Sequence, residues 1–231
     1  MEKPFINILT RTSNRKKGFK ICAMSVASQS YKKINHIVAY DNVDDVSYID
    51  MHKVQKVEIN KQDLIDKDTS KNPNNPLFWH SPHNLYCNVL MDQVKDGYIM
   101  FLDDDDMLIS DSTISRIVKN IIDEDTILIW QMRYPNGNLL PSDLSFSDQK
   151  VRLGDIGSPC FLFHCKWKDY YRWDAYKCGD YRFLAKLYSK IPNHKWIKKP
   201  FIQLNNDGGF GKKLDIESEN KILRKGAVLL Q

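Results

Sequence analysis

The chain has 231 residues, of which 42% are hydrophobic and 27% are charged, and its formal net charge is +5. These values are ordinary for a globular protein of one large domain and exclude an intrinsically disordered chain. The basic residues lie in scattered pairs and triplets, so no run resembles an arm that binds nucleic acid. Beside a simple solvated surface, a mild attraction to phosphates or a peripheral contact with a membrane stays open.

Cysteine content and apolar runs indicate the compartment. Five cysteines, an odd number without a Cys-x-x-Cys pair, predict buried reduced thiols and neither a disulfide framework nor a zinc site. No stretch approaches the roughly 20 apolar residues of a membrane span. The apolar segment near the start of the sequence is too short for a signal peptide. We therefore expect a cytoplasmic protein without a transmembrane segment.

Short apolar runs and helical patterns alternate at the start of the chain. Residues 5–9 (FINIL) predict a buried strand that ends in a polar loop over residues 10–15. Apolar side chains recur at helical spacing over residues 19–27 and predict an amphipathic helix. Residues 36–40 (HIVAY) predict a second strand, which ends at Asp41.

The pattern then continues toward the most unusual stretch of the sequence. Residues 54–59 predict a short third strand, and the polar residues 60–82 predict a loop. A helix is predicted over roughly residues 83–95 and a buried strand over residues 98–102. That strand ends in four consecutive aspartates, residues 103–106.

The second half is less regular. Asp111 is predicted to be the N-cap of a helix whose apolar face runs over residues 114–122. The patterns that follow predict, in order, a strand over 127–132, a turn over 135–138, a strand over 160–163, a helix starting near Asp180 and a strand over 196–204. Residues 208–211 (GGFG) are either a loop that closes over a ligand or a frayed tail.

Strands that alternate with helices predict an α/β fold, with a mostly parallel sheet covered by helices on both faces, in a single domain over residues 1–231. Ligands of such sheets bind at the carboxyl ends of the strands. Thr10 and Arg11, Asp41 and the four aspartates all follow predicted strands. Three polar clusters are therefore expected to meet at one edge of the sheet.

Four adjacent carboxylates repel one another unless a positive group is near. Their hard oxygen ligands suit Mg²⁺ or Mn²⁺. In an extended segment Asp103 and Asp105 point to one side, and Asp104 and Asp106 to the other, so one alternate pair can bind a metal ion. The remaining carboxylates can bind a sugar or ribose hydroxyl. The alternative is a solvated loop in which Asp105 or Asp106 helps to cap the next helix.

Four stretches together resemble the GT-A-fold glycosyltransferases, most closely their inverting, family 2-like group: ILTRTSNR (8–15), HIVAYDN (36–42), HNLYCNVLMDQVKDGYIMFLDDDDML (83–108) and KCGDYRFLAKL (177–187). The resemblance implies a Rossmann-like fold with a nucleotide-sugar-binding half over residues 1–110 and an acceptor-binding half over residues 111–231. It implies transfer of a sugar from a nucleotide-diphosphate sugar, with UDP favoured, to a hydroxyl of a glycan, lipid-linked or protein acceptor.

The resemblance also implies roles for residues that contact the donor. Thr10 and Arg11, with Arg15 as an alternative, would contact the nucleotide. Asp41 would accept a hydrogen bond from the base, most naturally the uracil N–H, although Asp41 and Asn42 also suit a plain turn. Asn84 would contact the nucleotide or the diphosphate, its alternative being a role at the start of a helix.

The remaining roles concern the metal and the proton. Asp103 and Asp105 would bind Mn²⁺ or Mg²⁺, with Asp105 the preferred direct ligand, while Asp104 at the variable position would contact the nucleotide sugar. Asp180 would be the general base, or only a helix cap. Asp155 and Asp174 are the next candidates for the base.

Two further features have a functional and a plain interpretation. His164 is either a metal ligand or a partly buried histidine after a strand. The aromatic residues Trp167, Tyr170, Tyr171 and Trp173 either bind an acceptor sugar or pack in the core.

Two other functions stay open. A sugar nucleotidyltransferase usually has a glycine-rich loop after its first strand, and residues 10–15 contain no glycine. The aspartate cluster argues against a non-catalytic module that only binds nucleotide sugars or glycans.

Overall fold

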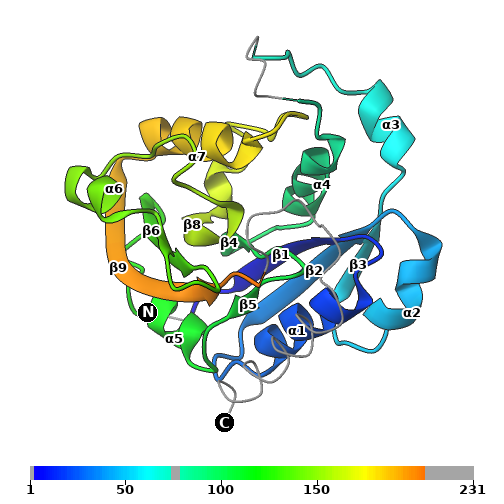
Figure 1. The fold of residues 1–231 in the computed structure, drawn as a ribbon, viewed down its shortest axis with the longest axis horizontal. Coiled ribbons are helices and arrows are strands. Elements are labelled where there is room, and N and C mark those ends of the chain that lie inside the picture. Colours follow the sequence, from blue (N-terminus) through cyan, green and yellow to red (C-terminus); the bar gives the residue numbers. More distant parts are fainter. Residues whose placement is uncertain (1–2, 74–78, 206–231) are drawn as a thin grey trace.

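The computed structural model describes residues 3–73 and 79–205. A nine-stranded sheet has the strand order β3-β2-β1-β4-β8-β6-β9-β5, and β7 pairs with β6 (Figure 1). The strands are β1 (Ile6–Thr12), β2 (Ile34–Tyr40), β3 (Gln55–Glu58), β4 (Tyr98–Phe101), β5 (Met107–Leu108), β6 (Thr126–Arg133), β7 (Leu139–Leu140), β8 (Phe161–His164) and β9 (Asn193–Gln203).

Helices lie on both sides of the sheet, with α4 and α7 on one side and α1 and α5 on the other (Figure 1). The α-helices are α1 (Lys16–Ala27), α2 (Val46–Ile49), α3 (Lys61–Asp66), α4 (Tyr86–Asp92), α5 (Thr113–Val118), α6 (Asp143–Asp148) and α7 (Gly179–Lys190). The 3-10 helices are η1 (Val43–Asp45), η2 (Pro82–Leu85), η3 (Ser158–Cys160) and η4 (Cys165–Trp167). None of the described helices has the length and apolar character needed to cross a bilayer.

The predicted α/β fold is confirmed, and its parallel part is the first half of the chain. Strands β3, β2, β1 and β4 pair in parallel, which brings the carboxyl ends of all four to one edge. The other strands form a mixed region, because β8 runs antiparallel to both β4 and β6 whereas β9 runs parallel to β6. The apolar runs fill the core: every residue of β4 is buried, as is every residue of β8.

Helix α1 forms where the apolar spacing predicts it. Phe19, Cys22, Ala23 and Val26 are all buried on its inner face. All five cysteines lie in the described part of the chain and are free, and four of them are buried, as expected.

Three local predictions are wrong. The strand that was expected to end at residue 9 continues to Thr12, so residues 10–12 alternate across the sheet and do not form a loop. The predicted loop over residues 60–82 contains α3, whose N-cap Asn60 accepts a hydrogen bond from the Asp63 N–H. Helix α5 begins at Thr113 with Ser112 as its N-cap, so Asp111 does not cap it. Residues 74–78 and the GGFG stretch at 208–211 lie outside the described residues.

Candidate active site

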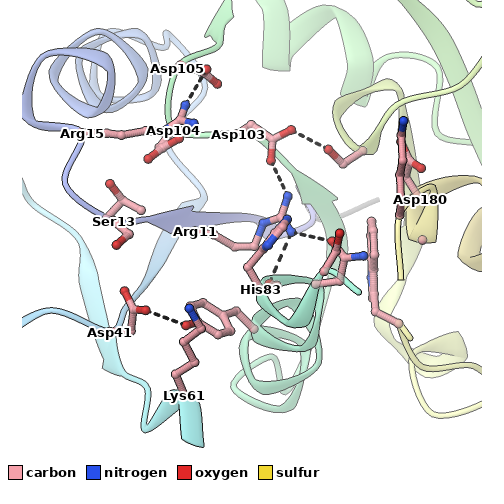
Figure 2. A pocket seen from close by; sticks show the side chains of 18 of the residues that line it. Arg11, Ser13, Arg15, Asp41, Lys61, His83, Asp103, Asp104, Asp105 and Asp180 are labelled. Atoms are coloured by element: carbon pink, nitrogen blue, oxygen red, sulfur yellow. Dashed lines mark hydrogen bonds and ion pairs between the residues drawn. The ribbon is translucent and has the colours of Figure 1, made fainter. Parts of the chain in front are cut away.

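A pocket of about 510 Å³ opens at the carboxyl ends of the parallel strands (Figure 2). Eight of the nine predicted donor, metal and base residues line it: Arg11, Arg15, Asp41, Asn84, Asp103, Asp104, Asp105 and Asp180. Thr10 does not line the pocket. The residues come from both halves of the chain, so the pocket is bounded by the parallel strands on one side and by the start of α7 on the other.

Arg11 lies at the centre of the pocket, near the end of β1 (Figure 2). Its guanidinium donates to Asp103 Oδ1 over 3.0 Å and to Asn84 Oδ1 over 3.1 Å. It also donates to the backbone carbonyl of His83 over 3.4 Å. One cation therefore links three elements: the end of β1, the residues after β4, and η2.

Thr10 faces the opposite side of β1, inside the protein. Its side chain is fully buried and hydrogen-bonds to His36 Nε2 over 3.0 Å. The prediction that its side chain contacts the nucleotide does not fit this position. The physical reason is the extra length of β1, since neighbouring residues of a strand point to opposite faces.

The four aspartates form a turn, not the extended segment that the sequence predicted. The Asp106 N–H donates to the Asp103 carbonyl over 3.0 Å, which closes the turn. Helix α1 packs closely against it at Gly18, where an added Cβ would lie 3.1 Å from the Asp104 carbonyl oxygen. The turn therefore directs its carboxylates differently from the simple alternation of a strand.

Two arginines neutralise the aspartates that line the pocket. Asp103 accepts hydrogen bonds from Arg11 and, over 2.7 Å, from the Ser158 hydroxyl. Arg15 Nη1 lies 2.6 Å from Asp105 Oδ2 and 3.4 Å from Asp104 Oδ1. Asp106 does not line the pocket and accepts a hydrogen bond from the Asn205 N–H.

The aspartates differ in how readily they ionise. Burial acts to raise the pKa of Asp103, but the Arg11 charge and the hydrogen bonds from Ser158 and Arg11 outweigh burial and hold the pKa below its usual range. Burial raises the pKa of Asp104 to about 7, against the opposing effect of Arg15. Burial, together with the neighbouring Asp105 and Asp103, also raises the pKa of Asp106. Near neutral pH the turn thus has an ionised carboxylate at Asp103 and a partly protonated one at Asp104.

Asp41 follows β2 and points into the pocket beside Lys61 (Figure 2). Its Oδ2 accepts a hydrogen bond from the Tyr86 hydroxyl over 2.8 Å. Its Oδ1 is buried and has no hydrogen-bond partner within the described residues. The neighbouring Asn42 caps η1 by accepting from the Asp44 N–H. A buried acceptor without a donor is costly, so Asp41 Oδ1 is suited to an N–H from a ligand.

Asp180 is the second residue of α7 and faces the pocket from the side opposite Asp41 (Figure 2). Its Oδ1 accepts a hydrogen bond from the Tyr181 N–H over 2.8 Å, and Cys178, not Asp180, is the N-cap of the helix. Burial raises the pKa of Asp180 to about 6, and the charge of Asp103 adds to this effect. A carboxylate with this pKa can accept a proton near neutral pH.

The two other candidates for the base have structural roles. Asp155 accepts hydrogen bonds from the Ser142 N–H and hydroxyl and from the Ser145 hydroxyl, which fixes the start of α6. Asp174 forms a two-pronged ion pair with Arg182, over 2.6 and 2.5 Å. Neither residue lines the pocket, so Asp180 is the best placed of the three.

Across residues 3–73 and 79–205, one group of three possible metal ligands lies within 4.8 Å of one another: Asp96, His164 and Cys165. It lies at the other end of β4 from the aspartate turn. Both ring nitrogens of His164 already have neighbours, since Nδ1 accepts from the Lys166 N–H and Nε2 faces Glu124 Oε1 at 3.7 Å. This arrangement supports the plain interpretation of His164 as a partly buried histidine after a strand.

Of the four predicted aromatic residues, Trp173 lines the pocket, and it does so from the core. It is buried and stacks on Phe183 with ring centroids 5.0 Å apart. Trp167 and Tyr170 contact each other beside η4, and neither lines the pocket. The predicted acceptor platform of four aromatic rings is therefore not formed at this pocket.

Solved structures match the fold, although no family model and no curated protein sequence matches the chain. S. aureus TarS 1–349 in complex with UDP-GlcNAc is 18% identical with a TM-score of 0.64, over 97% of this chain and 66% of that chain. Mannosyltransferase PcManGT from Pyrobaculum calidifontis, in complex with GDP-Man and Mn²⁺, is 12% identical with a TM-score of 0.62, over 99% of this chain and 70% of that chain. The chain shares the fold of these two structures.

The match to TarS covers only part of the TarS chain. A longer S. aureus TarS structure matches with a TM-score of 0.63 at 17% identity, and the match covers 97% of this chain but 39% of that one. The chain thus spans about two thirds of the shorter TarS structures and less than half of the longer one.

Several pocket residues carry no sequence pattern that would identify them. Lys61 belongs to α3, which has no buried residue and therefore no apolar periodicity. Ser158 contacts Asp103 across 55 positions of the sequence. Cys178 and Lys177 directly precede α7, inside a motif noted for its aspartate. The motifs indicated most of the charged residues of the pocket. They did not indicate the neighbouring side chains that contact these residues, such as Ser158.

Proposed function

We propose that this protein is a glycosyltransferase that moves a sugar from a nucleotide-diphosphate sugar, with UDP favoured, to an acceptor hydroxyl, with inversion. The observation that carries the proposal is the meeting of Arg11, Asp41, the aspartate turn and Asp180 in one pocket. The fold, which is that of nucleotide-sugar complexes of TarS and PcManGT, supports it. We keep residues 1–110 as the donor-binding half and residues 111–231 as the acceptor-binding half.

The donor would lie along the carboxyl edge of β2 and β1. Asp41 Oδ1 would accept the uracil N3–H, since it is buried and has no partner within the described residues. Arg11 and Arg15 line the same pocket as Asp41 and the aspartate turn and would bind the diphosphate oxygens. Asn84 would orient Arg11 through the 3.1 Å hydrogen bond between them. Asp104 would contact the sugar part of the donor.

A divalent cation, Mn²⁺ or Mg²⁺, fits the donor set of the turn. Asp103 is ionised and provides hard oxygen ligands, as does Asp105, and these two residues would hold the metal. A Mg²⁺ or Mn²⁺ ion held by two carboxylates would take its other ligands from water and substrate phosphates. When bound, the cation supplies positive charge to the departing diphosphate.

Asp180 would act as the general base. Its carboxylate would take the proton of the acceptor hydroxyl while the acceptor oxygen bonds to the anomeric carbon. The bond from that carbon to the diphosphate oxygen breaks on the opposite face, and the diphosphate leaves with the electron pair. Arg11 would contribute positive charge to the leaving group from its position beside Asp103.

A thermal-shift panel of nucleoside diphosphates and their sugars, with and without Mn²⁺, tests the proposal, because a ligand bound to the native state raises Tm. We expect the largest rise with UDP or a UDP-sugar plus Mn²⁺, and slow hydrolysis of that donor. Binding without any turnover would favour a non-catalytic module. A rise with a nucleoside triphosphate and a sugar 1-phosphate would favour a nucleotidyltransferase. If no nucleotide raises Tm, the proposal is wrong.

A further inference from the structure

The chain segment that carries Asp180 is held from both halves, by Arg182 of α7 and by side chains of the donor-binding half. Residues 172–180 contribute Trp173, Cys178 and Asp180 to the pocket wall. Cys178 has a φ of 61°, in the left-handed region that residues other than glycine seldom adopt. Such a conformation persists where the surrounding contacts fix it. The contacts that fix this segment therefore bear on where Asp180 points.

Asn88, in the middle of α4, grips the backbone of this segment. Its Oδ1 accepts from the Trp173 N–H over 2.8 Å, and its Nδ2 donates to the Trp173 carbonyl over 2.9 Å. One turn further along α4, Asp92 pairs with both terminal nitrogens of Arg172, over 2.7 and 2.6 Å. Asn88 itself does not line the pocket. Its side chain satisfies both backbone groups of one residue, as a neighbouring strand would.

Asn84 lies one helical turn before Asn88 and contacts the far end of the same segment. Its Nδ2 donates to the Tyr176 carbonyl over 2.8 Å. It also packs against Gly179, where an added Cβ would lie 2.7 Å from Asn84 Nδ2. The other end of the Asn84 amide accepts from Arg11. The same side chain thus joins the predicted diphosphate contact to the residue next to Asp180.

We infer that Asn88 is a positioning residue, which together with Asn84 holds residues 172–180 so that Asp180 faces the donor. The inference rests on the proposed function. It assigns the placement of the base to η2 and α4, the two consecutive helices that precede β4, so that Asn84 and Asn88 together set both Arg11 and Asp180. Asn88 contacts neither substrate in this arrangement, and it acts through the backbone of Trp173.

The kinetic test is Asn88→Ala, compared with Asn120→Ala as a matched control. Asn120 makes a similar side-chain hydrogen bond, to the Arg116 carbonyl on the exposed face of α5, and lies outside the pocket. For Asn88→Ala we expect at least a tenfold loss of kcat, UDP binding within twofold of wild type, and a changed pH profile of kcat. Asn120→Ala should leave all three unchanged. A lower Tm with unaltered kcat and pH profile would overturn the inference.

A second measurement does not depend on turnover. Cys178 is the one cysteine of the five that is not buried, so its alkylation by iodoacetamide reports on the segment. We expect Asn88→Ala to increase the rate several-fold and Asn120→Ala to leave it unchanged; equal rates in all three proteins would refute the positioning role. If wild type binds no nucleotide, the proposed function fails and this rate alone decides the inference. If Asn88→Ala does not fold, Asp92→Asn releases the same segment at an exposed pair, and the same outcomes apply.

Discussion

Strand β4 has side chains that could bind a metal ion at both of its ends, and the two ends differ in their surroundings. At the carboxyl end, Asp103 and Asp105 line a pocket and are paired with Arg11 and Arg15 from other elements. At the amino end, Asp96 is exposed, and the ring nitrogens of His164 have neighbours of their own. Both ends bring carboxylates close to other polar side chains, but the carboxyl end also has a cavity, two arginine counter-charges and Asp180 on the opposite wall.

The two ends of β4 differ in the contacts that they can offer to a ligand. Arginine side chains can exchange a carboxylate partner for a phosphate oxygen, so the ion pairs of the carboxyl end can be redistributed when a diphosphate and a metal enter. The amino end is held by backbone hydrogen bonds, among them the one that the Cys165 N–H donates to the Gly97 carbonyl over 2.9 Å. A rigid cluster of this kind stabilises the sheet and leaves little to a ligand.

The largest effect should follow from removing the base at the carboxyl end. For Asp180→Asn we expect the transfer rate to fall by about 10²–10⁴-fold, the usual contribution of a placed general base. Donor binding should stay within a few-fold, because Asp180 lies across the pocket from Asp41 and Arg15. Rates from single-turnover experiments, with UDP titrations beside them, measure both quantities. Transfer near the wild-type rate would remove Asp180 from the mechanism.

A matched pair of variants compares the two ends directly. Asp103→Asn removes the ionised partner of Arg11, and hydrogen bonds to charged groups are worth about 1.5–3 kcal/mol, or roughly 10- to 100-fold in affinity. We expect Mn²⁺-dependent UDP binding to weaken by that factor. Asp96→Asn makes the same chemical change at the amino end and should leave binding unchanged. Calorimetric titration of both variants is the measurement, and equal losses would contradict the comparison.

Acidification should affect the carboxyl end through Asp180. The base must be ionised, and its pKa is raised to about 6 by burial and by Asp103. As pH falls through 6 the carboxylate takes up a proton, so kcat should drop by about tenfold between pH 7 and pH 5. Asp104, whose pKa is raised to about 7, is expected to make donor binding depend on pH as well, so KM and kcat should be measured separately. A flat kcat over this range would contradict the assignment.

Much of this arrangement was predictable, because apolar runs locate the parallel strands and the residues after each run reach the same edge. Arg11, Asp41 and Asp103 were expected at this edge, and all three line the pocket there. Thr10 was not placed correctly, since the polar residues 10–12 do not reveal that the strand continues through them. The turn at residues 103–106 was also missed, because its geometry depends on the packing of α1 against it at Gly18.

Contacts between distant segments account for the other omissions. In the sequence Asn88 is an ordinary helix residue. Its proposed positioning role depends on its contact with Trp173, which lies 85 positions later in the chain. Ser158 became part of the site through η3, which follows a stretch without a clear pattern. Local patterns predict which residues can do chemistry, whereas the side chains that orient them depend on the tertiary fold.

The smallest effect is expected at the amino end of β4. His164→Gln removes the ring beside Glu124, and Cys165→Ser replaces the thiol, while the hydrogen bond from the residue 165 N–H to Gly97 is kept. Both variants should keep kcat and UDP affinity within twofold of wild type, and each should bind Zn²⁺ no differently from the parent. Zinc content after dialysis and the rate of donor turnover measure this. If the parent protein holds stoichiometric zinc and the variants lose both zinc and turnover, both ends of β4 are functional. The amino end would then not be a purely structural cluster.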